Sequence, residues 1–149
     1  MSTTTAKLPA VLVSRVIKAP RERVFQAWTT PSDIMKWMGC GESKAQSAEV
    51  DLRVGGKYQI NMKSSECGTL QVNGVYKEIK SPSRLVFTWG WESSEPGSER
   101  FETLVTIDLL ERDGSTEVKV THEGFTDSET RDRHAFGWNA CLDKFEKLA

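Results

Sequence analysis

The segment from residue 126 to residue 148 constrains the fold of this chain more than any other. Drawn as a helix with about 100° between successive residues, it presents a single apolar stripe of the width that a helix needs to lie on a core. The stripe is formed by His134, Trp138, Cys141, Leu142 and Phe145, with Leu148 at its margin. Thr126 and Glu129 have the spacing of a capping box at the start of such a helix. We therefore expect one long C-terminal helix that packs on a sheet.

The sequence before this segment carries patterns typical of short strands, with β-branched residues or an alternation of apolar and polar residues. We expect seven strands, over residues 11–18, 48–53, 57–63, 69–79, 84–91, 101–109 and 116–123. Two short helices follow the first strand, over residues 20–30 and 32–37. Gly74 indicates a bulge or a close approach of two strands, and Asp113-Gly114 is typical of a tight hairpin. Short connections make the sheet antiparallel, so the fold class is α+β.

Composition excludes several classes of function. A chain of 149 residues corresponds to one domain, and we expect a single domain over residues 1–149 with its core in 11–148. The net charge of -1 and the pI near 6.2 argue against a nucleic-acid partner. Cys40, Cys67 and Cys141 are too widely spaced to indicate a disulfide framework or a zinc site. No apolar run approaches the 18 or so residues of a membrane span, and we expect a cytoplasmic protein.

The sequence motifs of common catalytic sites are missing or incomplete. Gly55-Gly56-Lys57 is not a phosphate-binding loop, because that loop requires a glycine where Asp51 stands. His122-Glu123 begins a zinc-protease motif, but Thr126 occupies the position of its second histidine. We therefore assign no catalytic residue, metal ligand or cofactor, and expect binding rather than catalysis.

Aromatic residues are concentrated on the strands and on the helix stripe. Large rings around a gap between a curved sheet and a helix would form the mostly apolar concave site that small molecules use. The alternative is a filled core. If the cavity exists, the candidate ligand-binding residues are Trp37, Tyr58, Ile60, Tyr76, Phe87, Trp89, Phe101, Arg131, His134 and Trp138.

Three residues of the predicted C-terminal helix leave alternatives open. His134 lies one turn before Trp138, so it is either a polar contact for a ligand or a partly buried side chain bonded to a backbone carbonyl or to Arg131. Arg131 itself projects inward and marks either a pocket mouth or a solvated helix end. Phe136 points about 160° away from the stripe; it is simply exposed, covers a loop, or marks a partner surface.

Several segments, in order over residues 11–148, resemble the START-like (SRPBCC) superfamily. Residues 51–58 read Asp-Leu-Arg-Val-Gly-Gly-Lys-Tyr, residues 121–125 read Thr-His-Glu-Gly-Phe, and residues 134–138 form a His-x-x-Gly-Trp segment. The chain is most similar to the bacterial proteins that resemble the C-terminal domain of the activator of the heat-shock chaperone ATPase. This resemblance implies the helix-grip fold, in which a seven-stranded antiparallel sheet grips the C-terminal helix over a cavity.

The resemblance implies less about activity, because shared fold is not shared function. Members of the superfamily bind lipids, sterols, plant hormones or polyketides, some are cyclases or aromatases, and the eponymous domain assists a chaperone. We expect a non-enzymatic module that binds a small hydrophobic molecule between the sheet and the C-terminal helix. The alternatives are an interaction module for a chaperone or other protein, and a cyclase-like or aromatase-like enzyme.

Overall fold

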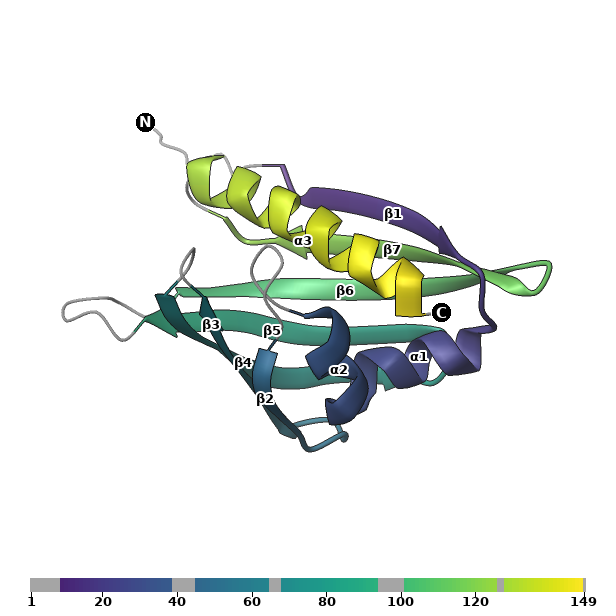
Figure 1. Ribbon diagram of the computed structural model, residues 1–149, viewed down its shortest axis with the longest axis horizontal. Coiled ribbons are helices and arrows are strands. Elements are labelled where there is room, and N and C mark those ends of the chain that lie inside the picture. The colour runs from purple at the N-terminus through teal and green to yellow at the C-terminus, as the bar shows by residue number, and fades with distance from the viewer. Residues whose placement is uncertain (1–8, 39–44, 65–67, 94–100, 126–127, 149) are drawn as a thin grey trace.

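The computed structural model describes residues 9–38, 45–64, 68–93, 101–125 and 128–148 and contains one seven-stranded antiparallel sheet, in the order β1-β7-β6-β5-β4-β3-β2 (Figure 1). The elements along the chain are β1 (Val11–Ile17), α1 (Arg21–Thr29), α2 (Pro31–Trp37), β2 (Ala45–Val50), β3 (Lys57–Ser64), β4 (Gly68–Lys80), β5 (Arg84–Ser93), β6 (Phe101–Arg112), β7 (Ser115–Glu123) and α3 (Ser128–Leu148). The predicted α+β fold is confirmed.

Short turns give the sheet its antiparallel order. Asp113 and Gly114 join β6 to β7 with φ angles of 50° and 86°, and Arg112 pairs with Ser115 across the turn. Both central residues thus occupy the left-handed region that a two-residue hairpin requires, which an aspartate tolerates and a glycine favours. The tight hairpin predicted at this position is confirmed.

One strand ends earlier than its sequence pattern predicts. The segment 48–53 was expected to be extended, but β2 ends at Val50 and residues after it turn the chain toward β3. The Arg53 amide donates to the Asp51 carbonyl at 2.9 Å, and the Arg53 side chain reaches the Asp51 carboxylate at the same distance. These local bonds compete with the sheet ladder, and Gly55 completes the turn with a φ of 87°.

Strands β4 and β5 approach each other closely at Gly74. A Cβ atom at this position would lie 2.0 Å from the Thr88 carbonyl oxygen, so a larger residue cannot stand there without moving the strands. The same threonine accepts a hydrogen bond from the Val75 amide on its hydroxyl, at 2.8 Å. The close approach predicted from the sequence is confirmed, and a register irregularity follows between Tyr76 and Glu78.

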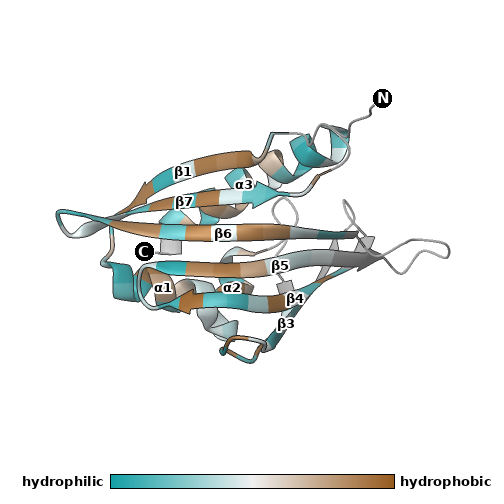
Figure 2. Ribbon diagram, turned by 180° about the vertical axis from the view of Figure 1, so that it is seen from behind, coloured by the Kyte–Doolittle hydropathy of each residue, from teal (hydrophilic) through white to brown (hydrophobic). Residues whose placement is uncertain are grey.

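All of the described helices lie on one face of the sheet (Figure 1). The opposite face carries none of them, and apolar and polar segments follow one another along its strands (Figure 2). Helix α3 packs against β1 and α2, and Arg15 of β1 joins it through Asp143 at 2.7 Å and Asn139 at 3.0 Å. None of the helices in the described ranges is long and apolar enough to cross a membrane.

Four residues of the predicted stripe of α3 are buried, namely Trp138, Cys141, Leu142 and Phe145, whereas His134 is half-buried. Phe136 is 75% exposed on the other side of the helix, as its angle from the stripe predicts. The residue expected to cap the helix, Thr126, lies outside the described residues.

Helices α1 and α2 carry two indole rings into the interior between α3 and the sheet. Trp28 and Trp37 meet edge to face with ring centroids 4.6 Å apart, and both contact Phe145 of α3. The Trp37 Nε1 atom donates to the Ala27 carbonyl at 2.9 Å, which fixes the second helix against the first. Because Pro31 begins α2 directly after α1 ends, the two helices turn sharply and both indoles face the sheet.

Candidate functional site

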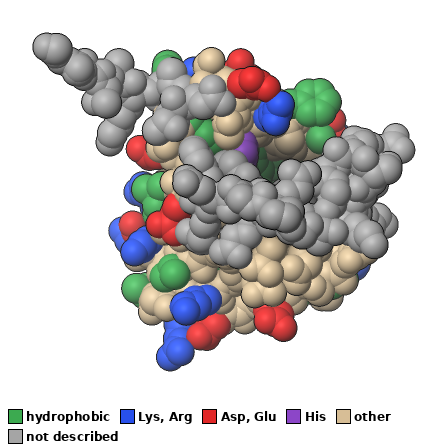
Figure 3. Space-filling model, turned by 90° about the vertical axis from the view of Figure 1, so that its left-hand side faces the viewer, with side chains coloured by type: hydrophobic (Ala, Val, Ile, Leu, Met, Phe, Trp, Pro, Cys, Tyr) green, Lys and Arg blue, Asp and Glu red, His purple; other side chains and the backbone are tan. Residues whose placement is uncertain are grey.

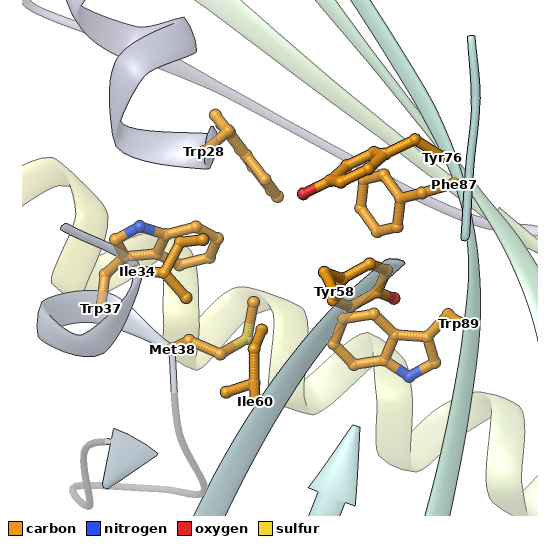
Figure 4. Close-up of a pocket in the computed structure, with 9 residues that line it drawn as sticks. All are labelled: Trp28, Ile34, Trp37, Met38, Tyr58, Ile60, Tyr76, Phe87 and Trp89. Atoms are coloured by element: carbon orange, nitrogen blue, oxygen red, sulfur yellow. The ribbon is translucent and has the colours of Figure 1, made fainter. Parts of the chain in front are cut away.

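A cavity lies between these two helices and strands β3, β4 and β5. Figure 4 shows two walls facing each other, one from α1, α2 and the residue after them, and one from the strands. The helix wall consists of Trp28, Ile34, Trp37 and Met38, and the sheet wall of Tyr58, Ile60, Tyr76, Phe87 and Trp89. On the sheet wall the rings of Tyr58, Tyr76 and Phe87 pack together with centroids 5.4 to 6.1 Å apart. The lining is therefore almost wholly apolar and largely aromatic.

The cavity is small in this conformation. The space between the atoms amounts to about 300 Å³, which includes narrow gaps and part of an open mouth, and only about 20 Å³ of it can hold the centre of a water molecule. One or two water molecules fill such a space. A ligand with a ring therefore requires the helix wall to move outward, and the flexible thioether of Met38 suits that wall to adjustment.

The polar atoms of the lining differ in whether they have partners. The Tyr58 hydroxyl donates to the Thr88 carbonyl at 2.6 Å, and the Trp37 Nε1 atom is bonded within the helix pair. The Tyr76 hydroxyl points into the cavity and has no hydrogen-bond partner among the described residues (Figure 4). The Nε1 atoms of Trp28 and Trp89 are buried and equally without partners. Burial raises the pKa of Tyr76, so its phenol is neutral.

Six of the ten residues predicted for the site line this cavity, namely Trp37, Tyr58, Ile60, Tyr76, Phe87 and Trp89. The prediction missed Trp28, Ile34 and Met38. Their signal in the sequence was the pair of short apolar helices after the first strand, which were expected but not placed over the sheet. The side chain of Phe101 lies outside the described residues.

The remaining predicted residues belong to α3 and do not line the cavity. Trp138 stands directly behind it, with ring centroids 5.8 Å from Trp28 and 5.2 Å from Trp89. The cavity was expected beneath the C-terminal helix, but its helical lining comes from α1, α2 and Met38, and α1 and α2 lie beside α3 on the same face of the sheet (Figure 1). The helix wall is therefore formed by α1, α2 and Met38, and Trp138 of α3 packs against Trp28 of this wall.

A chain of buried hydrogen bonds centred on His122 ties α3 to the sheet. The Trp138 Nε1 atom donates to His122 Nδ1 at 3.0 Å, and His122 Nε2 lies 2.5 Å from the Thr103 hydroxyl. Because Nδ1 accepts, the proton of the neutral ring is on Nε2, which donates to the Thr103 oxygen. The Thr103 hydroxyl in turn donates to the Trp89 carbonyl at 2.9 Å. His122, which the sequence showed in an incomplete zinc-protease motif, is 0% exposed; it bonds Trp138 directly and reaches the Trp89 backbone through Thr103.

Both histidines are held neutral by burial. Desolvation, followed by the charge of His134, lowers the pKa of His122 to about 2. Burial also lowers the pKa of His134, although the Thr130 carbonyl opposes this shift by accepting a hydrogen bond from Nδ1 at 2.9 Å. The two rings lie 5.1 Å apart. Neither side chain is a proton donor at neutral pH, because both bear a single ring proton that is already committed to a hydrogen bond.

The start of α3 forms a separate polar region. The backbone-carbonyl bond of His134 is one of the two arrangements expected from the sequence, and the Arg131 guanidinium pairs with Asp132 at 3.0 Å. Figure 3 shows a histidine inside a hollow at this end of the molecule, and of the two histidines only His134 has exposed surface. Arg131 and His134 thus do not line the aromatic cavity, although the ring of His134 lies 6.5 Å from that of Trp89. Among the described residues, no group of three or more His, Cys, Asp or Glu side chains is placed to hold a metal ion.

Comparison with solved structures finds the same fold in bacterial proteins. A protein from Chromobacterium violaceum matches with a TM-score of 0.81 and 25% identity, over 93% of this chain and 95% of that one. The AHSA1 protein from Silicibacter pomeroyi gives a TM-score of 0.80 and 23% identity, over 93% and 96% of the two chains. A protein from Nitrosomonas europaea gives 0.79 and 19%, over 94% and 93%. No curated protein matches the sequence.

The family comparison agrees with the helix-grip fold that the resemblance implied. Residues 18–149 match the family described as Activator of Hsp90 ATPase homolog 1-like protein. This match covers helices α1, α2 and α3 and strands β2 to β7, so it includes all nine residues that line the cavity. The chain therefore belongs to the family of Activator of Hsp90 ATPase homolog 1-like proteins, with a START-like fold.

Proposed function

We propose that this protein binds a small hydrophobic molecule in the aromatic cavity between α1, α2 and strands β3 to β5. The observation that carries the proposal is the unfilled space between two apolar walls, into which the Tyr76 hydroxyl points without a hydrogen-bond partner among the described residues. Buried polar groups in a filled core are nearly always hydrogen-bonded. A core that had evolved only for packing would place phenylalanine here.

The coarser function follows from the family and fold, which are those of a ligand-binding or interaction module. Catalysis is not part of the proposal. Among the described residues of the lining, only Tyr58 and Tyr76 have ionisable side chains, and the buried His122 is hydrogen-bonded to Trp138 and Thr103. General acid–base catalysis needs a group whose pKa lies near the operating pH.

A titration with a neutral aromatic hydrocarbon tests the proposal. Naphthalene is added to the protein, and the fluorescence of its tryptophans is followed, since Trp28, Trp37 and Trp89 line the cavity. Saturable quenching is expected. In Ile60→Phe the larger side chain fills the space and binding should fall at least about tenfold, because the ligand and the added ring compete for one volume.

The matched control places the same added ring on the surface. Val54 is exposed in the turn between β2 and β3, so Val54→Phe should bind naphthalene as the wild type does. If Ile60→Phe binds as tightly as Val54→Phe, the hydrocarbon binds elsewhere and the proposed site is wrong.

A second candidate function is a protein-interaction module, and the observation that favours it is the exposure of Phe136. A large apolar side chain that is 75% exposed on a long helix is a suitable anchor for a partner. The family description names an activator of the Hsp90 ATPase, so the partner to test is the Hsp90-type chaperone of the same organism. The ATPase rate of that chaperone is measured with the wild type and with Phe136→Ala; equal rates with and without either protein would reject this candidate.

A further inference from the structure

The polar atoms of the cavity restrict the chemistry of what can occupy it. Of the two hydroxyl groups among the nine described lining residues, that of Tyr76 points into the cavity and has no hydrogen-bond partner among the described residues. This residue is only 3% exposed, so little of it is open to bulk water. The ring of Trp28 lies on the opposite wall (Figure 4). Its Nε1 atom is a buried donor without a hydrogen-bond partner among the described residues.

We infer that the ligand of this cavity is a neutral molecule whose hydrogen-bond acceptor, such as a ketone or ester carbonyl oxygen, receives a bond from the Tyr76 hydroxyl. The inference rests on the proposed function and extends it from hydrophobic molecules in general to one chemical class. An indole N–H can only donate, so Trp28 offers no acceptor for a ligand donor. Trp89 is not counted, because its Nε1 atom lies on the side of the ring away from the Tyr76 hydroxyl (Figure 4).

The described lining offers few acceptors to a ligand, namely the two phenol oxygens, and that of Tyr76 can accept only one or two hydrogen bonds. The Tyr58 hydroxyl, the other phenol of the sheet wall, is bonded to the Thr88 carbonyl at 2.6 Å. That carbonyl therefore points at a phenol rather than at a ligand. A ligand that must donate hydrogen bonds, such as a sugar or a polyol, would leave its own donors unsatisfied and would lose their hydration on entry.

Charge is excluded by the same lining. None of the nine side chains is a lysine, arginine, histidine, aspartate or glutamate. A carboxylate or an ammonium group would therefore lose its hydration without gaining an opposite charge, which is the costliest form of burial. The ligand class is thus neutral, largely apolar and aromatic or alicyclic, with a hydrogen-bond acceptor at one end.

Three probes of the same shape separate these claims in calorimetric titrations. Acetophenone carries the carbonyl acceptor, α-methylstyrene replaces its oxygen with a methylene group, and benzoate replaces its methyl group with a charged oxygen. Wild type should bind acetophenone and α-methylstyrene, and benzoate at least about tenfold more weakly. In Tyr76→Phe, binding of acetophenone should fall about fivefold, as for the loss of one hydrogen bond, while α-methylstyrene should change less than about twofold.

Tyr58→Phe is the matched control, because it removes a hydroxyl group from the same wall but one that is already bonded to the backbone. It should leave the ratio of the two affinities at the wild-type value. Equal weakening of both neutral probes by Tyr76→Phe, binding of α-methylstyrene alone, or benzoate binding as tight as acetophenone would each overturn the inference while leaving the proposed cavity intact. If none of the three probes binds the folded wild type, the proposed function fails and the inference fails with it.

Discussion

The hydrogen bond between Trp138 and His122 can be measured by a double-mutant cycle. His122→Leu removes the acceptor and leaves the Trp138 Nε1 donor buried without a partner, which costs about 1–3 kcal/mol at a site that is 0% exposed. The Thr103 hydroxyl loses His122 as a partner but keeps its bond to the Trp89 carbonyl, so the cost at Thr103 is smaller than the cost at Trp138. We expect His122→Leu to lower the free energy of unfolding by about 2–3 kcal/mol in total.

Trp138→Phe removes the donor and part of the ring that packs on Trp28 and Trp89. Its expected cost is roughly 2 kcal/mol, about half from the lost hydrogen bond and half from the lost apolar area. In the double variant neither partner is left to be unsatisfied. Its destabilisation should therefore be smaller than the sum of the two single values by about 1–2 kcal/mol.

The assay is urea unfolding at pH 7.5, followed by far-ultraviolet circular dichroism because the variants change the fluorescence. Equal m-values are required, so that the midpoints report stability alone. Additivity of the two substitutions within about 0.5 kcal/mol would refute the reasoning, because it would mean that the two side chains act independently.

The other predictions concern pH, packing and the exposed ring. The His122 pKa is about 2 in the folded chain, below the ordinary 6.5 of an unfolded one, so its stabilising contribution is complete above pH 6.5 and is lost as the pH falls toward 2. The unfolding free energy of the wild type should thus fall by up to about 1.4 kcal/mol per pH unit below 6.5. Urea titrations at pH 7.5 and 5.0 should show a smaller drop in unfolding free energy for His122→Leu than for the wild type; an equal drop would contradict this. Gly74→Ala should cost about 3 kcal/mol or more, since its Cβ would overlap the Thr88 carbonyl; a midpoint close to wild type would show that the strands separate freely. Phe136→Ala should change stability by less than about 0.5 kcal/mol, and a larger loss would mean that the ring packs on the fold.

The elements that depend on periodicity could be predicted from the sequence. The stripe of α3 repeats with the helical period over several turns, and each of its buried residues was placed correctly. The hairpin at Asp113-Gly114 was equally predictable, because the required backbone angles exclude most other residues. The end of β2 was not predictable in this way, since the bonds between Arg53 and Asp51 that form the turn depend on a side chain and not on a repeat.

The sheet side of the cavity followed from the alternation of β3, β4 and β5, which fixes the face on which Tyr58, Tyr76 and Phe87 lie. The helix side did not. Periodicity indicates which side of α1 and α2 is apolar, but not which part of the sheet those helices cover, and that placement decides that Trp28 rather than Trp138 forms the wall. The role of His122 was hidden for the same reason, because its partners come from β6 and α3, 19 and 16 residues away in the chain.

Methyl-group NMR with a bound probe tests the central claim most directly. The protein is labelled at the δ1 methyl groups of isoleucine and mixed with acetophenone, and contacts between ligand and methyl protons are recorded. Ile34 and Ile60 line the cavity, whereas Ile17, Ile79 and Ile107 do not. Our account predicts contacts from the probe to Ile34 and Ile60 alone in the wild type, and weaker contacts to Ile34 in Ile60→Phe. Contacts to the other isoleucines, or shifts confined to surface residues while Ile34 and Ile60 remain unchanged, would contradict it.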